Sequence, residues 1–323
     1  LKIRRSARMA MTGVIIKQII IMFLLIISGF VCFKIGLLDK DTNQKLSSLV
    51  LKFINPALII SSYQIEFKME YLAGLGWTFL FAMITMLLSI FISKIVVRER
   101  EGCDNAVERF SIIYSNSGFM GIPLVNSMLG ATGVFYLTAY ITAFTLMVWT
   151  HGVMLMKKEK SSGSFLNVVK APAFIAMLIG LLLFVFRIPL PSVINSALKY
   201  IGDMNTPLPM IVSGAMIAQT NMAKSFLKPR AYLVSLYRLL VIPVAIVLIL
   251  MLFHIEGTVF YTVVIAAACP AAAMGTLFAV NYGRDYLYAS ELFVVTTLLS
   301  IVTLPLVFLL ANLLSTFKIG FSL

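Results

Sequence analysis

Long apolar stretches make up most of the chain, and polar residues gather in short segments between them. A helix needs about 20 mainly apolar residues to cross a hydrocarbon core of roughly 30 Å. The pattern predicts ten such helices, numbered from first to tenth, at residues 14–33, 46–63, 72–97, 107–128, 132–155, 168–186, 192–220, 231–253, 258–281 and 286–313. The expected fold class is therefore an all-α integral membrane protein with ten transmembrane helices.

The composition supports a membrane protein and excludes several other classes. The chain of 323 residues is 60% hydrophobic and 12% charged, whereas soluble domains are about 45–50% apolar and about 25% charged. This balance excludes a soluble enzyme, a disordered chain and a secreted disulfide scaffold. Cys32, Cys103 and Cys269 lie far apart and show no metal-binding spacing. We therefore expect no metal and no cofactor.

Basic residues are concentrated in alternate loops. The net charge is +13, which we assign to a membrane rather than to a nucleic acid, because cytoplasmic loops are enriched in Lys and Arg. The loops after the odd-numbered helices hold most of the basic residues, namely Lys34, Lys40, Lys45, Arg98, Arg100, Arg109, Lys157, Lys158, Lys160, Lys170, Lys224, Lys228 and Arg230. The alternate loops contain only Lys68 and Arg187. This pattern predicts a multi-pass plasma membrane protein with both termini outside.

The first ten residues do not fit that orientation. Residues 1–10 include four basic side chains on the predicted outer side, and the chain begins with Leu1. Two interpretations are open. The reading frame is over-extended and the protein starts at Met9 or Met11, or the segment is a basic tail whose charge is outweighed by the later loops.

Prolines in a polar or small-residue setting recur at nearly constant spacing. Pro207 follows Pro56 by 151 residues, and Pro270 follows Pro123 by 147 residues. The two markers give nearly the same offset, which indicates an internal repeat. Matched interruptions in corresponding helices are also the best sequence indication of a transporter binding site.

The repeat divides the chain into two five-helix halves. The predicted halves are residues 11–156 and 168–323, joined by a polar cytoplasmic linker at residues 157–167. Because five is odd, the second half enters the membrane in the opposite orientation. The chain is therefore predicted to be an inverted repeat, as in many secondary transporters.

Small and polar residues surround the prolines of the fourth and ninth helices. A helix broken there leaves backbone N–H groups unpaired and presents a positive dipole end, which suits an anionic ligand. The candidate substrate-binding residues are Asn116, Gly118, Gly121, Pro123, Pro270, Ala271 and Gly275. Asn116 either donates its amide to the substrate or caps carbonyl groups of the broken helix. Ser115, Ser117 and Thr276 either line the path or pack helices.

A second group of candidates lies in the second and seventh helices. Lys52 and Asp203 each precede a proline by four residues, so they occupy equivalent positions with opposite charges. They are expected to form a neutralising pair, or Asp203 carries a coupling proton. The full group of scaffold or coupling candidates is Lys52, Asn55, Pro56, Asp203, Asn205 and Pro207. Three further basic residues are expected to extend to the membrane surface, namely Lys17, Lys199 and Arg238.

The string Asn-Ser-Gly-Phe-Met-Gly-Ile-Pro-Leu at 116–124, Asn-Pro-Ala at 55–57, and Pro270 carry a family resemblance. With these residues the chain resembles the auxin efflux carrier family of permeases, in its compact bacterial form. Plant members of that family move indole-3-acetate, and bacterial members are associated with malate or malonate-type carboxylates. The resemblance implies that the fourth and ninth helices cross at their prolines. It also implies that helices one, two, six and seven form a scaffold for the rest.

The expected function is secondary transport of a small organic anion, such as a carboxylate, by alternating access. Two alternatives are a sodium-coupled symporter of related architecture and an anion channel. H⁺ or Na⁺ is considered as a coupling ion, and homodimerisation is left open. The chain shows no GxSxG or HExxH motif and no paired catalytic acids, so no enzyme activity is expected.

Overall fold

The computed structural model describes residues 2–98, 104–157 and 168–321. All elements in these ranges are helices, apart from one isolated β-bridge. Five of the described helical segments are long and apolar enough to cross a membrane, at Ile16–Lys34, Met69–Val96, Ser117–Met156, Pro229–Leu252 and Tyr286–Ser315. These segments, with shorter apolar helices, are those of a multi-pass membrane protein.

Helix occurs in every range that the apolar pattern predicts. The first part of the chain contains α1 (Lys2–Lys34), α2 (Lys40–Leu49), η1 (Val50–Ile54), α3 (Asn55–Ser62), α4 (Met69–Val96), α5 (Asn105–Ile113), η2 (Ser117–Gly121), α6 (Ile122–Met147), η3 (Val148–Gly152) and α7 (Val153–Met156). The second part contains α9 (Pro172–Val185), α10 (Ser192–Asp203), α11 (Pro207–Ala218), α12 (Met222–Phe226), α13 (Pro229–Leu236), η4 (Tyr237–Val241), α14 (Ile242–Leu252), α15 (Gly257–Ala268), α16 (Met274–Asn281) and α17 (Tyr286–Phe321).

Several boundaries differ from the predicted ones. Helix α1 begins at Lys2, twelve residues before the predicted start of the first helix, so it includes most of the basic segment at residues 1–10. By contrast, the helix is interrupted within α6 at Gly130, whose backbone is not helical (φ +62°, ψ −156°), and this position falls in the gap predicted between the fourth and fifth helices. The seventh predicted helix is two helices, α10 and α11, separated by a turn at 204–206.

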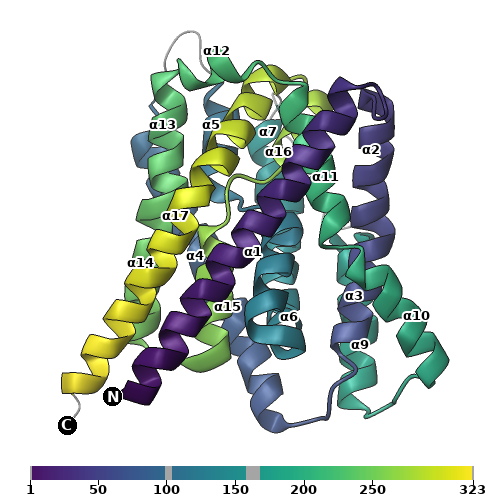
Figure 1. Ribbon diagram of the computed structural model, residues 1–323, viewed down its shortest axis with the longest axis vertical. Helices are drawn as coiled ribbons and strands as arrows, with labels where there is room; N and C mark the ends of the chain where they lie inside the picture. The colour runs from purple at the N-terminus through teal and green to yellow at the C-terminus, as the bar shows by residue number, and fades with distance from the viewer. Residues whose placement is uncertain (1, 99–103, 158–167, 322–323) are drawn as a thin grey trace.

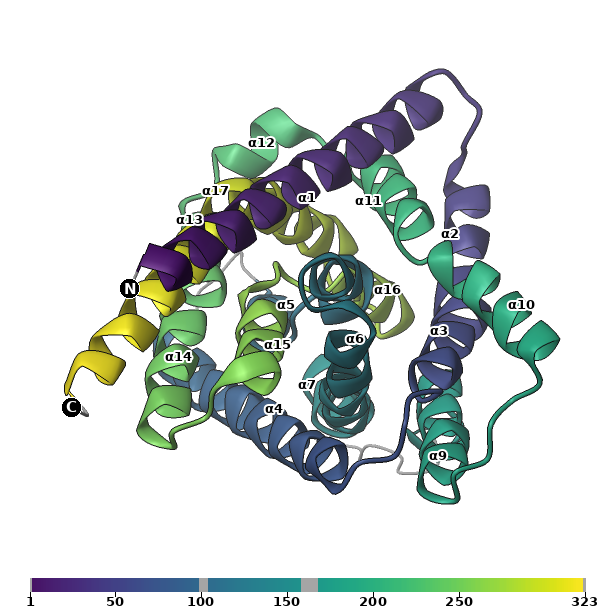
Figure 2. The same cartoon turned by 60° about the horizontal axis from the view of Figure 1, so that its bottom comes forward.

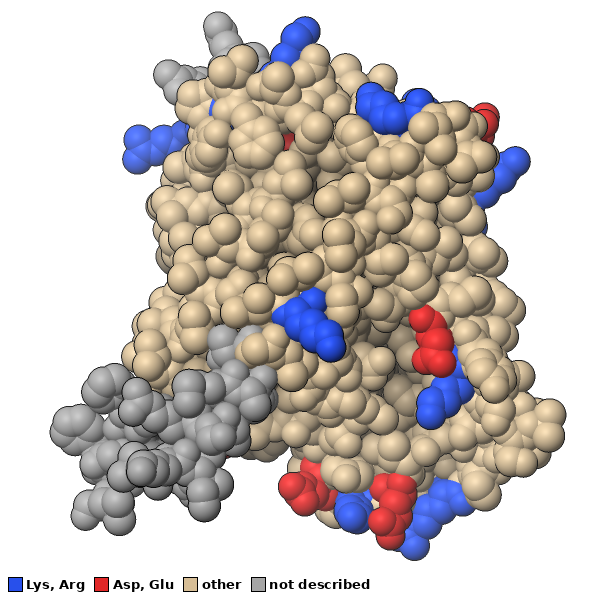
Figure 3. All heavy atoms as spheres, in the orientation of Figure 1, with Lys and Arg blue, Asp and Glu red and all other residues tan. Residues whose placement is uncertain are grey.

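Helix α6 lies inside the bundle, with α1 and α4 at its periphery (Figures 1 and 2). In the most apolar 18-residue window of the Ser117–Met156 segment 78% of the residues are buried, against 22% in that of Ile16–Lys34, so the latter segment faces mostly outward. The chain ends of α1 and α17 lie at the same end of the molecule (Figure 1). On the face shown in Figure 3, most charged side chains lie toward the two ends, and a mainly uncharged zone separates them.

Three π-helical turns each end two residues before a proline, at Pro56, Pro123 and Pro243. Proline lacks an N–H group, and its ring clashes with the carbonyl four residues earlier. A wider turn relieves this clash, and each turn is closed by a bond to the carbonyl five residues back, from Asn55 to Val50, Ile122 to Ser117 and Ile242 to Tyr237. Pro123 therefore lies in a continuous helix and does not interrupt it.

The predicted fourth and ninth helices are each broken, the fourth between α5 and η2 and the ninth between α15 and α16. The two breaks cross at an antiparallel bridge between Ser115 and Ala271. The Asn116 N–H donates to the Pro270 carbonyl at 2.8 Å, and the Ala272 N–H donates to the Tyr114 carbonyl at 2.9 Å. Pro270 lies at the crossing as expected, whereas Pro123 lies seven residues beyond Asn116. The expectation that both prolines mark the crossing is therefore wrong.

Helices α1 and α11 touch through two glycines. A Cβ on Gly29 would lie 2.0 Å from the Ile211 carbonyl oxygen, and one on Gly214 would lie 1.9 Å from the Ile26 carbonyl oxygen. Small residues allow such close backbone contact between membrane helices. This contact joins one helix from each of the two predicted halves of the chain.

We expect Gly29→Ala and Gly214→Ala to destabilise the protein by about 1–3 kcal/mol each, because the helices must separate to admit a methyl group. The measurement is the melting midpoint of the detergent-purified protein. Gly76→Ala in α4 is the matched control, since a Cβ there meets no atom within 4 Å. Equal midpoints for Gly29→Ala and Gly76→Ala would contradict the close contact.

Candidate functional site

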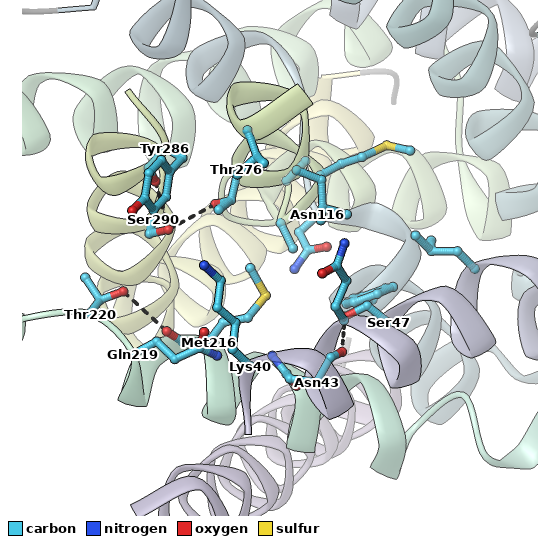
Figure 4. Close-up of a pocket in the computed structure, with 18 of the residues that line it drawn as sticks. Lys40, Asn43, Ser47, Asn116, Met216, Gln219, Thr220, Thr276, Tyr286 and Ser290 are labelled. Carbon is cyan, nitrogen blue, oxygen red and sulfur yellow. Dashed lines mark hydrogen bonds between the residues drawn. The ribbon is translucent and has the colours of Figure 1, made fainter. Parts of the chain in front are cut away.

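A cavity of about 780 Å³ lies between two groups of helices. One wall comes from α2, η1 and α11, and the opposite wall comes from η2, α16 and α17. Figure 4 shows the polar side chains of both walls around it. The polar lining residues are Lys40, Asp41, Asn43, Gln44, Ser47, Ser115, Asn116, Gln219, Thr220, Thr276, Asn281, Tyr286 and Ser290.

The inner wall of the cavity is the crossing of the two broken helices. It includes Ser115, Asn116 and Gly118 from one broken segment, and Ala272 to Met274 from the other. The η2 turn starts at Ser117 and continues into α6, and α16 starts at Met274. Both helices therefore begin at the cavity. The first N–H groups of a helix have no intrahelical acceptor, and its dipole is positive at this end, so both helix starts favour an anion.

Asn116 directs its side chain toward the cavity (Figure 4). Only 5% of the residue is exposed, and its Nδ2 has no hydrogen-bond partner among the described residues. Its side chain makes no capping bond to the following helix. The interpretation of Asn116 as a structural cap is therefore not supported, and a free amide donor lies at the inner wall.

Asn55 lies behind the same wall. Its Nδ2 is 3.9 Å from the point where a Cβ on Gly118 would lie, and its Oδ1 has no partner among the described residues. Asn205 is 1% exposed, and neither of its side-chain polar atoms has a partner there. Buried amides are normally paired, and exceptions need an explanation. Asn55 and Asn205 thus differ from ordinary structural asparagines.

The other predicted substrate residues do not line the cavity. A Cβ on Gly121 would approach the Cys269 sulfur at 3.5 Å, and one on Gly275 would approach the Phe110 ring at 3.2 Å. These two glycines permit close packing. Ala271 donates its N–H to Thr296 Oγ1 at 3.2 Å within the crossing. Of the seven predicted substrate-binding residues, Asn116 and Gly118 line the cavity. Ser115 and Thr276, which the sequence offered as either path-lining or packing residues, line it as well.

The cation Lys40 lies at the mouth of the cavity. The sequence analysis did not identify this residue as part of the site. The exposed Lys40 places Nζ 5.6 Å from the ring centre of Tyr286, so it bridges α2 and α17. The neighbouring Asp39 caps α2, because its carboxylate accepts the Thr42 N–H at 2.7 Å. That bond lowers the pKa of the Asp39 carboxyl. Asp41 also lines the mouth.

Lys52 and Asp203 do not form the expected pair. Both side chains are exposed, and the ion pairs among the described residues do not include either of them. The four-residue spacing before each proline does not bring them together, because η1 continues into α3 whereas a turn separates α10 from α11. Proton coupling through Asp203 stays a prediction, tested by proton-driven uptake in Asp203→Asn.

Arg238 does not extend to the membrane surface as expected. The residue is fully buried, and its Nη1 donates to the carbonyls of Ile112 at 2.9 Å and Ile113 at 3.1 Å. Its Nη2 donates to the carbonyl of Ala267. These three carbonyls belong to the last turns of α5 and α15. The available sequence signal was an arginine inside a strongly apolar segment, five residues before Pro243.

Comparison with known proteins gives a consistent result. The sequence model of a family described as membrane transport protein matches residues 14–165 and 163–308. An uncharacterized transporter of Methanothermobacter thermautotrophicus is 26% identical over 296 residues, which cover 90% of this chain and 96% of that protein. An uncharacterized transporter of Methanocaldococcus jannaschii is 23% identical over 294 residues, which cover 86% and 93%.

Proposed function

The chain belongs to the membrane transport protein family, the auxin efflux carrier family that its sequence resembles, and we propose that it is a secondary transporter of a small carboxylate. The observation that carries the proposal is the inner wall of the cavity. Two helices begin there, and the Asn116 amide beside them has an unpaired donor. No enzyme activity is proposed.

The chemistry of the cavity favours an anion of modest size. Each helix start resembles about half a positive charge, and Lys40 adds a cation at the mouth. Among the described lining residues the one acidic side chain is Asp41, which lies at the mouth rather than at the inner wall. The volume of about 780 Å³ falls within the usual range of small-molecule sites. A site made of amides and dipoles binds a carboxylate without a lysine at its inner wall, which favours release.

We propose alternating access through the predicted inverted repeat. In this proposal α1, α2–α3, α9 and α10–α11 form the scaffold, and the crossing helices move against it. The cavity lies on the boundary between these two groups, as a substrate site of such a carrier should. Its mouth is at the end rich in Lys and Arg, so the conformation faces the cytoplasm in the proposed orientation in the plasma membrane.

The proposed transport is tested in proteoliposomes with a panel of radiolabelled dicarboxylates, monocarboxylates and aromatic acids. We expect saturable uptake of one class and faster uptake when the same anion is present inside. A carrier produces this counterflow because the loaded site returns more readily, whereas an open channel does not. Uptake without saturation or counterflow would favour the anion channel, and no uptake of any class would reject the proposed substrate type.

We expect a cysteine placed in the 157–167 linker to resist a membrane-impermeant thiol reagent in intact cells. The prediction depends on the concentration of basic residues in the loops at that end. The background lacks Cys32, Cys103 and Cys269. Ser192→Cys, which is exposed at the start of α10 at the opposite end, is the control and should react. Labelling of the linker cysteine from outside would reverse the proposed orientation.

A further inference from the structure

Arg238 holds a fixed charge in the interior of the bundle. It lies in η4, within the apolar Pro229–Leu252 segment, and is fully buried. The ion pairs among the described residues do not include it. In the part of the chain that the structure describes, the titratable groups whose charge acts on Arg238 are Tyr140 and Cys269, neither of which is a carboxylate. Its bonded neighbours are instead backbone carbonyls.

Those carbonyls explain why a cation is stable there. Helices α5 and α15 both end at the crossing, where the last carbonyls of each lack an intrahelical donor. The dipoles of both helices are negative at this end. The guanidinium donates to carbonyls from both helices at once, at Ile112, Ile113 and Ala267. The π turn η4 is the local irregularity from which this side chain projects, and such turns are frequent at functional sites.

In many secondary transporters the C-terminal ends of half-helices and unwound carbonyls bind the coupling Na⁺. We infer that Arg238 is a built-in cation that occupies the position of a coupling sodium ion, so that transport does not require Na⁺ at the crossing. This inference rests on the proposed function. It decides between the uncoupled or proton-coupled carrier and the sodium symporter that the sequence left open.

The same charge has a consequence for the cavity. The carbonyl of Ile113 accepts from Arg238, and Ser115, two residues further along, already lines the cavity. The positive helix starts face the cavity, and the negative helix ends are neutralised by Arg238. Because charges act over longer distances where water is excluded, Arg238 adds to the positive potential of the site. A bound Na⁺ would add the same charge but would leave with the substrate.

The test uses heat stability of the purified protein, which needs no substrate. Arg238→Ala should lower the melting midpoint by about 5 °C or more, because it leaves three buried carbonyls unpaired. Millimolar guanidinium chloride should restore part of that midpoint, whereas urea, which has a similar shape and no charge, should not. A ligand that binds only the folded state raises its stability in this way. The wild-type midpoint should be the same in NaCl and KCl.

Leu239→Ala is the matched control, because it truncates a buried neighbour in the same turn and removes no charge. It should lower the midpoint without rescue by guanidinium. Equal effects of guanidinium and urea on Arg238→Ala would overturn the inference, as would stabilisation of the wild type by Na⁺ over K⁺. If Arg238→Ala cannot be purified, Arg238→Lys replaces it in the test, because lysine keeps the charge. This variant should fold with a midpoint below that of the wild type. A midpoint equal to that of the wild type, or failure of the Arg238→Lys protein to fold, would overturn the inference.

Uptake then separates this inference from the proposed function. For whichever anion the proteoliposome panel identifies, the initial rate should be equal with external Na⁺ or K⁺ at a clamped membrane potential. Acceleration by an inward Na⁺ gradient would overturn the role of Arg238 and leave the carrier proposal intact. Failure of the whole panel would reject the proposed substrate type, and the melting experiment would still decide the role of Arg238.

Discussion

Asn116→Ala should weaken binding of the transported anion about ten- to hundredfold, because a hydrogen bond between an amide and a charged group contributes roughly 1.5–3 kcal/mol. Asn116 is the lining residue with a buried, unpaired Nδ2 at the inner wall. Its backbone is already fixed by the bond from its N–H to the Pro270 carbonyl. The side chain can therefore be removed without loss of the crossing. The measurement is the dissociation constant of the anion identified by uptake, with the melting midpoint as a check of folding.

Asn105→Ala is the matched control for this variant. Asn105 is a half-buried asparagine at the start of α5, outside the cavity lining, and its Oδ1 also lacks a partner among the described residues. Its removal should leave affinity unchanged. Asn116→Asp should weaken binding more than alanine does, since it places a carboxylate beside an anion. Unchanged affinity in Asn116→Ala with a lowered midpoint would make Asn116 a structural residue.

The apolar pattern predicted where helix occurs but not how each helix is interrupted. Hydropathy reports the average polarity of about 20 residues, so it located the helices from Met69 to Val96 and from Pro229 to Leu252. The break at residues 114–116 depends on backbone bonds to a segment more than 150 residues away. A proline is visible in the sequence, but Pro123 follows a π turn that keeps its helix continuous.

The sequence predicted only part of the site, because it reports local features and not contacts between distant segments. Asn116 and Gly118 lie next to the break, so local sequence was enough to identify them. Lys40 enters the site only because α2 faces α17, and Arg238 only because η4 packs against two helix ends. The expectation that Lys52 and Asp203 pair used sequence equivalence in place of spatial contact. Equivalent positions in two halves need not touch.

A further network that the sequence did not indicate holds α5, α13 and α17 together. Glu108 is fully buried and accepts from Arg230 Nε at 2.9 Å and from the Tyr288 hydroxyl at 2.6 Å. Arg230 Nη2 also forms an ion pair with Glu108. These three residues come from three helices on the same side of the cavity. The network thus stabilises the group of helices that the proposed mechanism moves as a unit.

Arg230→Ala should lower the stability of the protein by about 3–5 kcal/mol, which corresponds to a melting midpoint lower by about 10 °C, because it leaves the Glu108 carboxylate buried without its cation. The double variant Arg230→Met with Glu108→Gln should recover most of that loss. It removes both charges, and the glutamine oxygen can still accept from Tyr288.

Lys68→Ala is the control, because its ion pair with Glu66 is largely exposed, with side chains 52% and 81% accessible. Exposed pairs contribute about 0–1 kcal/mol, so its midpoint should stay close to that of the wild type. Arg230→Ala matching Lys68→Ala would show that the buried pair contributes little. A double variant no more stable than Arg230→Ala would show that the two charges are not what the network requires.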